Sequence, residues 1–469
     1  MSASDRGFLF MGIGMTLLGR IRNIRLNPAQ FLVAGFALVI FIGSILLSLP
    51  AASADGSRLR YLDALFTATS ATCVTGLVVV DTGLQFSLFG ELVILVLIQV
   101  GGLGFMSMAT LIALALGRRI TLRGRLFLQE SLNQFSMAGL IRLTRHIALT
   151  TLVLEAIGAV ILAIRFSSRL PAGQAAYYGI FHAVSAFCNA GFDLFGPVSG
   201  AFSSITSWAT DAVVVLTMAA LIIAGGLGFP VIVELSGRRH ANSHRVSLHT
   251  RLVLTVTVFL LTLGTLVILG LEFANPSTMG HMDAGNRLLA AFFQALTPRT
   301  AGFNTVDTAS LRPATLFFVM ILMFIGASPS STGGGIKTST FGVLISTISS
   351  TIRGYDEVEM YERRIPRDLS QKASTIASIA LALVAVVTML LSITESATFL
   401  EVMFEAMSAF GTVGLSTGIT PRLSDFGRIL IIMTMFMGRL GPLTVVVALA
   451  QRKKIVANVH LAEERVMIG

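Results

Sequence analysis

The segments best suited to bind a ligand are four short glycine loops. Each is preceded by the pattern Phe-x-Ala-x-Ser/Thr. The loops end at Gly76, Gly191, Gly302 and Gly414, so the motif recurs about every 112 residues. Glycine adopts backbone angles that other residues avoid, so successive carbonyl oxygens can point the same way. Such oxygens can replace the hydration shell of potassium without adding net charge. The pattern therefore predicts a cation-binding site made of four backbone loops.

We expect the backbone of all four loops to contribute to this site as an ion selectivity filter. The alternative is that the glycines serve packing or turns, but one motif at four near-equal spacings favours a shared role. The predicted ion-binding residues are Thr72, Cys73, Val74, Thr75, Gly76, Phe187, Cys188, Asn189, Ala190, Gly191, Arg299, Thr300, Ala301, Gly302, Phe410, Gly411, Thr412, Val413 and Gly414.

The elements that must position these loops are membrane-spanning helices. The chain has 469 residues, of which 54% are hydrophobic and only 12% are charged, whereas soluble domains carry about 25% charged residues. A membrane span needs roughly 20 apolar residues. Apolar runs of about this length occupy residues 31–49, 92–116, 211–233, 252–271, 376–393 and 429–450. The chain is therefore predicted to be a multispanning membrane protein and not a soluble one.

The net charge of +10 reflects membrane orientation, because most lysines and arginines lie between the repeats or at the two ends. By the positive-inside rule those segments are cytoplasmic, and so are both termini. We therefore expect the charge to set orientation in the bilayer, with no nucleic-acid partner.

Each repeat reads as a helix, a short re-entrant helix, a glycine loop and a second helix. The short helices are predicted at residues 59–70, 175–187, 285–296 and 397–410. Because each unit begins and ends on the basic side, the four are parallel repeats about an axis along the membrane normal. Non-helical backbone at membrane depth must line a watery cavity or be buried in protein. The predicted fold is an all-α integral membrane protein with four tandem helix–pore loop–helix repeats around one pseudo-fourfold central pore.

The predicted boundaries follow the basic segments. They are a cytoplasmic N-terminal tail (1–29), pore repeat 1 (30–118), a cytoplasmic linker with pore repeat 2 (119–236), a linker with pore repeat 3 (237–352), a linker with pore repeat 4 (353–452) and a cytoplasmic C-terminal tail (453–469). Within the first tail, residues 8–18 are too short to span a membrane and are predicted to form an interfacial helix.

The third repeat contains an unusual break, because its second helix is interrupted by three consecutive glycines followed by Ile336 and Lys337. A phosphate-binding loop would place lysine directly after glycine and follow a strand, so this segment does not predict nucleotide binding. Arg439 occupies the equivalent place in the fourth repeat, where an arginine costs several kcal/mol unless it faces water or a partner. It is either an electrostatic element facing the pore or part of a buried structural pair.

These features together resemble the Trk/Ktr/HKT superfamily of cation transporters, and within it the KtrB-type membrane subunits of KtrAB potassium-uptake systems. The resemblance covers about residues 30–452. It rests on the four loops, on Gly-Gly-Leu-Gly-Phe at 101–105 and 225–229, on the segment 328–338 and on Gly-Arg-Leu-Gly-Pro at 438–442. Sodium-selective HKT members carry serine where this chain has Gly76, so the resemblance implies potassium transport. The open alternative is an HKT-like sodium or non-selective cation transporter.

The resemblance also implies a gate and partners. Residues 326–340 would form an intramembrane gating loop below the filter. A homodimer and a cytoplasmic KtrA-like regulatory ring that binds ATP or ADP are implied, as is sodium dependence in many members. This chain itself is expected to bind no nucleotide and to be no enzyme. The predicted gate residues are Gly326, Ser331, Thr332, Gly333, Gly334, Gly335, Lys337 and Arg439.

Three acidic residues near the loops leave a choice open. Asp63 and Glu405 lie in predicted short helices, and Asp193 follows the second loop. Asp63 and Glu405 either attract cations or pack and cap the short helices, and Asp193 is expected to border the outer vestibule.

Overall fold

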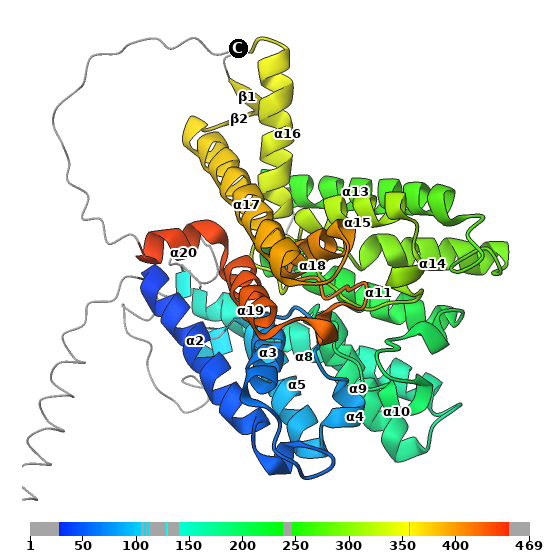
Figure 1. The fold of residues 1–469 in the computed structure, drawn as a ribbon. Coiled ribbons are helices and arrows are strands. Elements are labelled where there is room, and N and C mark those ends of the chain that lie inside the picture. Colours follow the sequence, from blue (N-terminus) through cyan, green and yellow to red (C-terminus); the bar gives the residue numbers. More distant parts are fainter. Residues whose placement is uncertain are drawn as a thin grey trace, which may run out of the picture.

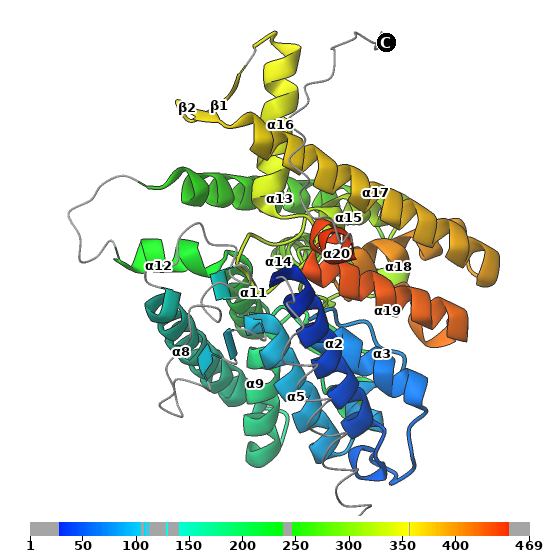
Figure 2. The same ribbon diagram turned by 90° about the vertical axis from the view of Figure 1, so that its left-hand side faces the viewer.

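The computed structural model describes residues 28–104, 107–108, 110–111, 128–129, 140–237, 246–355 and 357–449. Within them the fold is almost entirely helical, and the helices surround a common centre (Figures 1 and 2). The predicted interfacial helix at 8–18, the tail 453–469 and much of the linkers after the first and second repeats lie outside the described residues.

Four long helices form the outer layer, one at the start of each repeat. They are α2 (Pro28–Leu47), α8 (Leu140–Phe166), α13 (Leu248–Glu272) and α17 (Arg367–Thr394). Among the described helices, these four are long and apolar enough to cross a membrane. Large apolar side chains such as Leu149, Leu152 and Ile164 of α8 are more than 60% exposed. In a bilayer such side chains contact lipid, so the outer layer is the membrane-facing surface.

Four short helices lie inside this layer, close to the predicted positions. They are α3 (Tyr61–Thr72), α9 (Ala172–Phe187), α14 (Ala284–Leu296) and α18 (Phe399–Gly411). Each packs against the outer helix of its own unit. The last begins with a capping box, in which Thr398 and Glu401 satisfy each other's backbone N–H groups. All four end where the glycine loops begin.

The inner helices differ from the prediction, because every one of them is broken. The pieces are α5 (Leu88–Leu103), α11 (Ala212–Gly226) with α12 (Phe229–Gly237), α15 (Pro313–Phe324) with α16 (Thr338–Ile352), and α19 (Asp425–Leu440) with α20 (Pro442–Leu449). The sequence predicted a break in the third unit alone. Gly104, Gly228 and Gly441 have φ of 79–90°, which a continuing helix cannot accommodate. At Gly228 the two pieces meet at an angle of 100°.

The four units follow one another round a closed ring. Each inner helix packs against the short helix of the next unit: α5 on α9, α11 on α14, α15 on α18, and α19 on α3. The last contact joins the fourth unit to the first, and α2 also contacts α20. In Figure 1 the blue and red helices accordingly lie side by side. The ends of the described chain therefore meet.

The remaining elements are small. Short helical turns occur at α4 (Thr82–Gln85), α10 (Gly196–Ser199), η1 (Pro50–Ala52), η2 (Thr206–Trp208), η3 (Thr308–Ser310) and η4 (Thr420–Arg422). One feature departs from an all-helical fold: β1 (Val358–Met360) and β2 (Arg363–Ile365) form an antiparallel hairpin. Tyr361 and Glu362 both have positive φ, as a tight two-residue hairpin turn requires. With α16, the hairpin projects from one end of the molecule (Figures 1 and 2).

Candidate ion-binding site and gate

The four glycine loops share one backbone conformation. Each contains two residues of positive φ separated by a single residue, and the second is always the predicted glycine. The first is not a glycine, although a residue other than glycine costs about 1–3 kcal/mol in this left-handed backbone conformation. These first positions are Val74, Asn189, Thr300 and Thr412, with φ between 50° and 71°. Strain repeated at four equivalent positions indicates a constrained functional backbone.

The four glycines lie next to one another. A Cβ atom added to Gly76 would lie 2.5 Å from the Ala190 carbonyl oxygen and 3.0 Å from the Gly191 Cα. The same relation continues round the ring, so each glycine faces the carbonyl that precedes the next one. The pairs are Gly76 with Ala190, Gly191 with Ala301, Gly302 with Val413, and Gly414 with Thr75. The predicted loops are therefore brought together, in sequence order, around one axis.

A hydroxyl from each short helix holds its loop in place. Ser70 accepts a hydrogen bond from the Gly76 N–H at 3.0 Å, and Ser408 accepts one from the Gly414 N–H at 3.1 Å. In the other two units the hydroxyl donates instead, from Ser185 to the Phe192 carbonyl and from Thr297 to the Phe303 carbonyl, both at 2.7 Å. The Ser/Thr position of the repeated motif was visible in the sequence, but the sequence alone gave it no role. A hydroxyl at one fixed place in all four repeats was the available signal.

Glycines of the inner helices explain the repeated Gly-Gly-Leu-Gly motif. A Cβ atom on Gly101 would collide with the carbonyl oxygen of Thr72, at the end of the short helix of the same unit. Gly225 faces the Phe187 carbonyl and Gly438 the Phe410 carbonyl in the same way. These glycines allow the inner helix to approach the loop backbone closely.

Arg299 is placed differently from the other predicted filter residues. Its side chain is 6% exposed and turns away from the ring, where an Nη atom donates to the Thr257 hydroxyl on α13 at 3.3 Å. Its backbone remains in the third loop. The side chain therefore anchors this loop to the outer helix.

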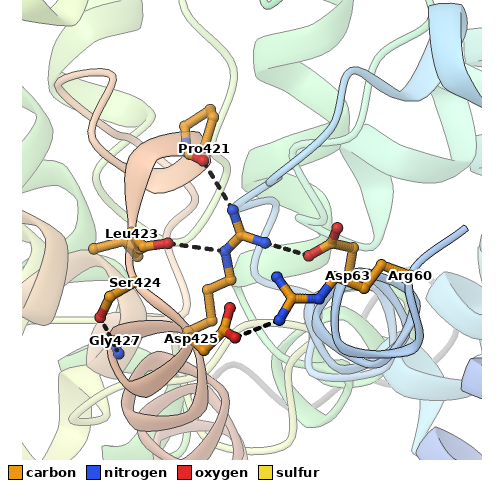
Figure 3. Close-up of polar contacts among 8 residues, drawn as sticks. Arg60, Asp63, Pro421, Leu423, Ser424, Asp425 and Gly427 are labelled. Atoms are coloured by element: carbon orange, nitrogen blue, oxygen red, sulfur yellow. Dashed lines mark hydrogen bonds and ion pairs between the residues drawn. The ribbon is translucent and has the colours of Figure 1, made fainter.

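The acidic residues near the loops act as structural ties. Asp63 forms an ion pair with Arg428 of α19, and Arg428 also donates to the Leu423 and Pro421 carbonyls (Figure 3). Arg60 pairs with Asp425 beside it (Figure 3). Both ion pairs join the first repeat to the fourth.

Glu405 and Asp193 have similar local roles. Glu405 is fully buried and accepts hydrogen bonds from Ser416 (2.8 Å) and Thr420 of the chain beyond the fourth loop. Asp193 accepts from the Phe195 N–H at 3.0 Å. For Glu405, these contacts favour the packing role over cation attraction.

Residues 326–337 form a true loop between α15 and α16. The Gly326 N–H donates to the Ile336 carbonyl at 2.9 Å, so the two ends of the loop pair with each other. The Thr332 hydroxyl donates to the Phe187 carbonyl at 3.2 Å, and the Gly334 N–H donates to the Thr412 hydroxyl at 3.1 Å. The predicted gate segment is thus hydrogen-bonded to the second and fourth glycine loops.

Two basic side chains hold this segment. Arg439 donates to the carbonyls of Thr332, Gly101 and Gly102, and therefore ties the loop to α5. Lys337 donates to the Gly333 carbonyl at 2.7 Å. Each of these Arg439 partners is neutral, so these contacts leave its positive charge uncompensated. This geometry favours the electrostatic alternative for Arg439 over a buried ion pair.

A cavity of about 530 Å³ adjoins the gate segment. Residues at the breaks of all four inner helices line it, together with the first turns of α2. Gly333 and Gly335 line it and also lie against Thr300 and Gly411 of the third and fourth glycine loops. The arrangement is a ring of carbonyl-bearing loops, a bridging segment and a wide vestibule.

Sequence reasoning missed one buried polar group near the ring. Glu155 of α8 is 6% exposed and accepts a hydrogen bond from Gln99 at 3.3 Å. Gln99 in turn accepts from the Cys188 thiol of the second loop at 3.5 Å. A single carboxylate in an apolar run was the signal that could have identified it.

Known proteins match this chain over nearly its whole length. The family model TrkH, described as a cation transport protein, matches residues 25–457. The Ktr system potassium uptake protein B of Bacillus subtilis is 42% identical over 96% of this chain and 98% of its own length. The potassium/sodium uptake protein NtpJ of Enterococcus hirae is 38% identical over 97% of this chain and 100% of its own.

A solved structure supports the fold. The crystal structure of the potassium transporter TrkH from Vibrio parahaemolyticus superposes with a TM-score of 0.68, covering 89% of this chain and 85% of that one at 19% identity. The match confirms the helical membrane architecture. From the family model and the full-length relatives together, the chain is a multi-pass membrane protein that belongs to the TrkH/Ktr family of cation transport proteins.

Proposed function

We propose that this chain carries potassium ions across the cell membrane through the centre of the ring formed by its four glycine loops. In this proposal the chain divides into pore repeats at 30–118, 119–236, 237–352 and 353–452, with its termini in the cytoplasm. The single observation that carries the proposal is the closed ring of Gly76, Gly191, Gly302 and Gly414.

Two physical features support cation passage at this ring. The short helices end at the loops, so the negative ends of their dipoles point toward the centre. The loops supply carbonyl oxygens held by buried hydroxyl braces. Carbonyl rings of this kind replace the hydration shell of an ion without requiring a charged side chain.

Potassium is favoured over sodium by the names of the relatives and by Gly76. One relative is called a potassium uptake protein and the other a potassium/sodium uptake protein. We therefore propose potassium as the main substrate and sodium as a second cation that supports or shares the pathway. An HKT-like transporter of sodium, or one without selectivity, is the alternative.

The segment 326–340 is proposed to be the gate. Its bonds to Phe187 and Thr412 place it directly against two of the four loops. A glycine-rich segment of irregular backbone can move without unfolding a helix. Arg439 holds this segment through the Thr332 carbonyl and adds a positive charge that opposes cation passage.

Regulation is proposed to come from outside this chain. A relative named as a member of a Ktr system indicates that further components take part. The proposed assembly is a homodimer that docks on a cytoplasmic, KtrA-like ring binding ATP or ADP. The hairpin β1–β2 and α16 project from the bundle and are suited to such a contact (Figure 2).

The test is cation flux into proteoliposomes that contain only this chain. Fluxes of potassium, rubidium and sodium would be compared at equal concentrations, with empty vesicles as the control. Potassium and rubidium should exceed sodium. Equal sodium flux would favour the alternative transporter. If no cation enters even after a KtrA-like ring is added, the proposed pathway is wrong.

A further inference from the structure

The charged residues that line the cavity beside the gate segment are all basic. Three basic side chains line it: Lys337, Lys372 and Arg439. Among the described residues that line the cavity there is no aspartate or glutamate. Lys337 uses one of its three N–H groups on the Gly333 carbonyl, and Lys372 is exposed at the cavity edge. Lys337 and Arg439 donate to neutral carbonyls, so their charges are costly inside a membrane protein and favour an anion nearby.

The backbone adds to this positive potential. Helix α16 is 15 residues long and begins at the cavity, where Ser339 and Thr340 of its first turn line the wall. Its N-cap residue, Lys337, supplies no side-chain acceptor to the first turn. The N-terminal end of a helix carries a partial positive charge and favours anions, phosphate in particular.

Another part of the cavity lining is apolar. Leu32 and Phe36 of the membrane-spanning helix α2 line it, together with Leu443 of α20. A small inorganic ion would leave this surface without a partner. A molecule with both an anionic group and a hydrocarbon part would contact both the basic and the apolar part of the lining.

We propose that this cavity binds a phosphate group, carried by an acidic phospholipid whose apolar part lies against α2. Basic pockets between helices on the cytoplasmic side are suited to phospholipid headgroups. The assignment to the inner leaflet rests on the proposed orientation of the chain. A bound phosphate would offset the charge of Lys337 and Arg439, which otherwise opposes a cation leaving the ring.

The experiment measures lipid binding directly and does not depend on ion flux. The full chain, purified in detergent, is mixed with equal amounts of phosphatidylglycerol and phosphatidylcholine and analysed by native mass spectrometry. Phosphatidylglycerol should be retained preferentially. Lys372→Gln should reduce its retention about fivefold, the effect of one basic residue near an anionic group, whereas Lys372→Arg should preserve it.

Arg353→Gln is the matched control, because Arg353 is an exposed cation at the opposite end of α16 and does not line the cavity. It should leave retention unchanged. Adding excess inorganic phosphate separates the two sources: displacement of the lipid shows that the site also takes phosphate from solution, and retention shows that the lipid is the ligand. Equal retention of the two lipids, or equal effects of Lys372→Gln and Arg353→Gln, would overturn the proposal. Failure of potassium flux would leave this result untouched.

Discussion

Replacement of Gly76 by serine should reduce selectivity by disturbing the neighbouring loop. A Cβ atom at this position would lie 2.5 Å from the Ala190 carbonyl oxygen, below the 3.0 Å that real Cβ contacts respect. The two loops must therefore separate by about half an ångström. The substitution also places a side chain at a φ of +89°, which costs about 1–3 kcal/mol.

Gly418 provides a control that separates the backbone strain from the collision with the neighbouring loop. It has nearly the same φ, +90°, but an added Cβ atom would meet nothing within 4 Å. Gly418→Ser thus carries the backbone strain without the collision. Gly418→Ser should lose thermal stability through the strain alone, whereas Gly76→Ser should lose more and should also distort the carbonyl ring.

The assay is the ratio of potassium to sodium flux in proteoliposomes. We expect Gly76→Ser to lower this ratio about tenfold, equivalent to about 1.4 kcal/mol, and Gly418→Ser to leave it near the wild-type value. Within the ring, Gly191→Ala should be milder, since its nearest carbonyl would lie 3.0 Å from the new atom. Equal flux ratios in the wild type and in both serine variants would refute the assignment of this ring as the selectivity filter.

Three further changes test the gate and the ring closure. Deleting part of 331–335 should raise basal potassium flux, because the segment bonded to the loops is shortened; a folded but silent protein would count against the gate. Arg439→Gln should also raise basal flux, since it removes both a carbonyl clamp and a positive charge; reduced flux at normal expression would contradict this role. Asp63→Asn should lower the free energy of unfolding by about 3 kcal/mol, measured by thermal unfolding in detergent, because it leaves the largely buried Arg428 unpaired. The exposed Arg60→Gln should have a much smaller effect, and an equally small loss for Asp63→Asn would show that its ion pair does not close the ring.

Much of the fold was predictable because its signals are local. The short helices and their glycine ends follow from a motif of about a dozen residues repeated four times. The outer spans follow from apolar length. The breaks at Gly104, Gly228 and Gly441 were not predicted, since a glycine in an apolar run is compatible with an unbroken span.

The sequence by itself identified the backbone segments proposed to carry the chemistry: four loops, one glycine-rich interruption and one arginine in an apolar run. Local residue types decide these features, because glycine, hydroxyl and apolar side chains act on the backbone next to them. Only the tertiary structure decided which residues of other repeats each segment contacts. The order of the glycines around the ring, the carbonyl partners of Arg439, the ion pair of Asp63 with Arg428 and the basic cavity all join residues from different repeats. Such contacts depend on how helices pack, and no local pattern specifies the residue on the facing helix.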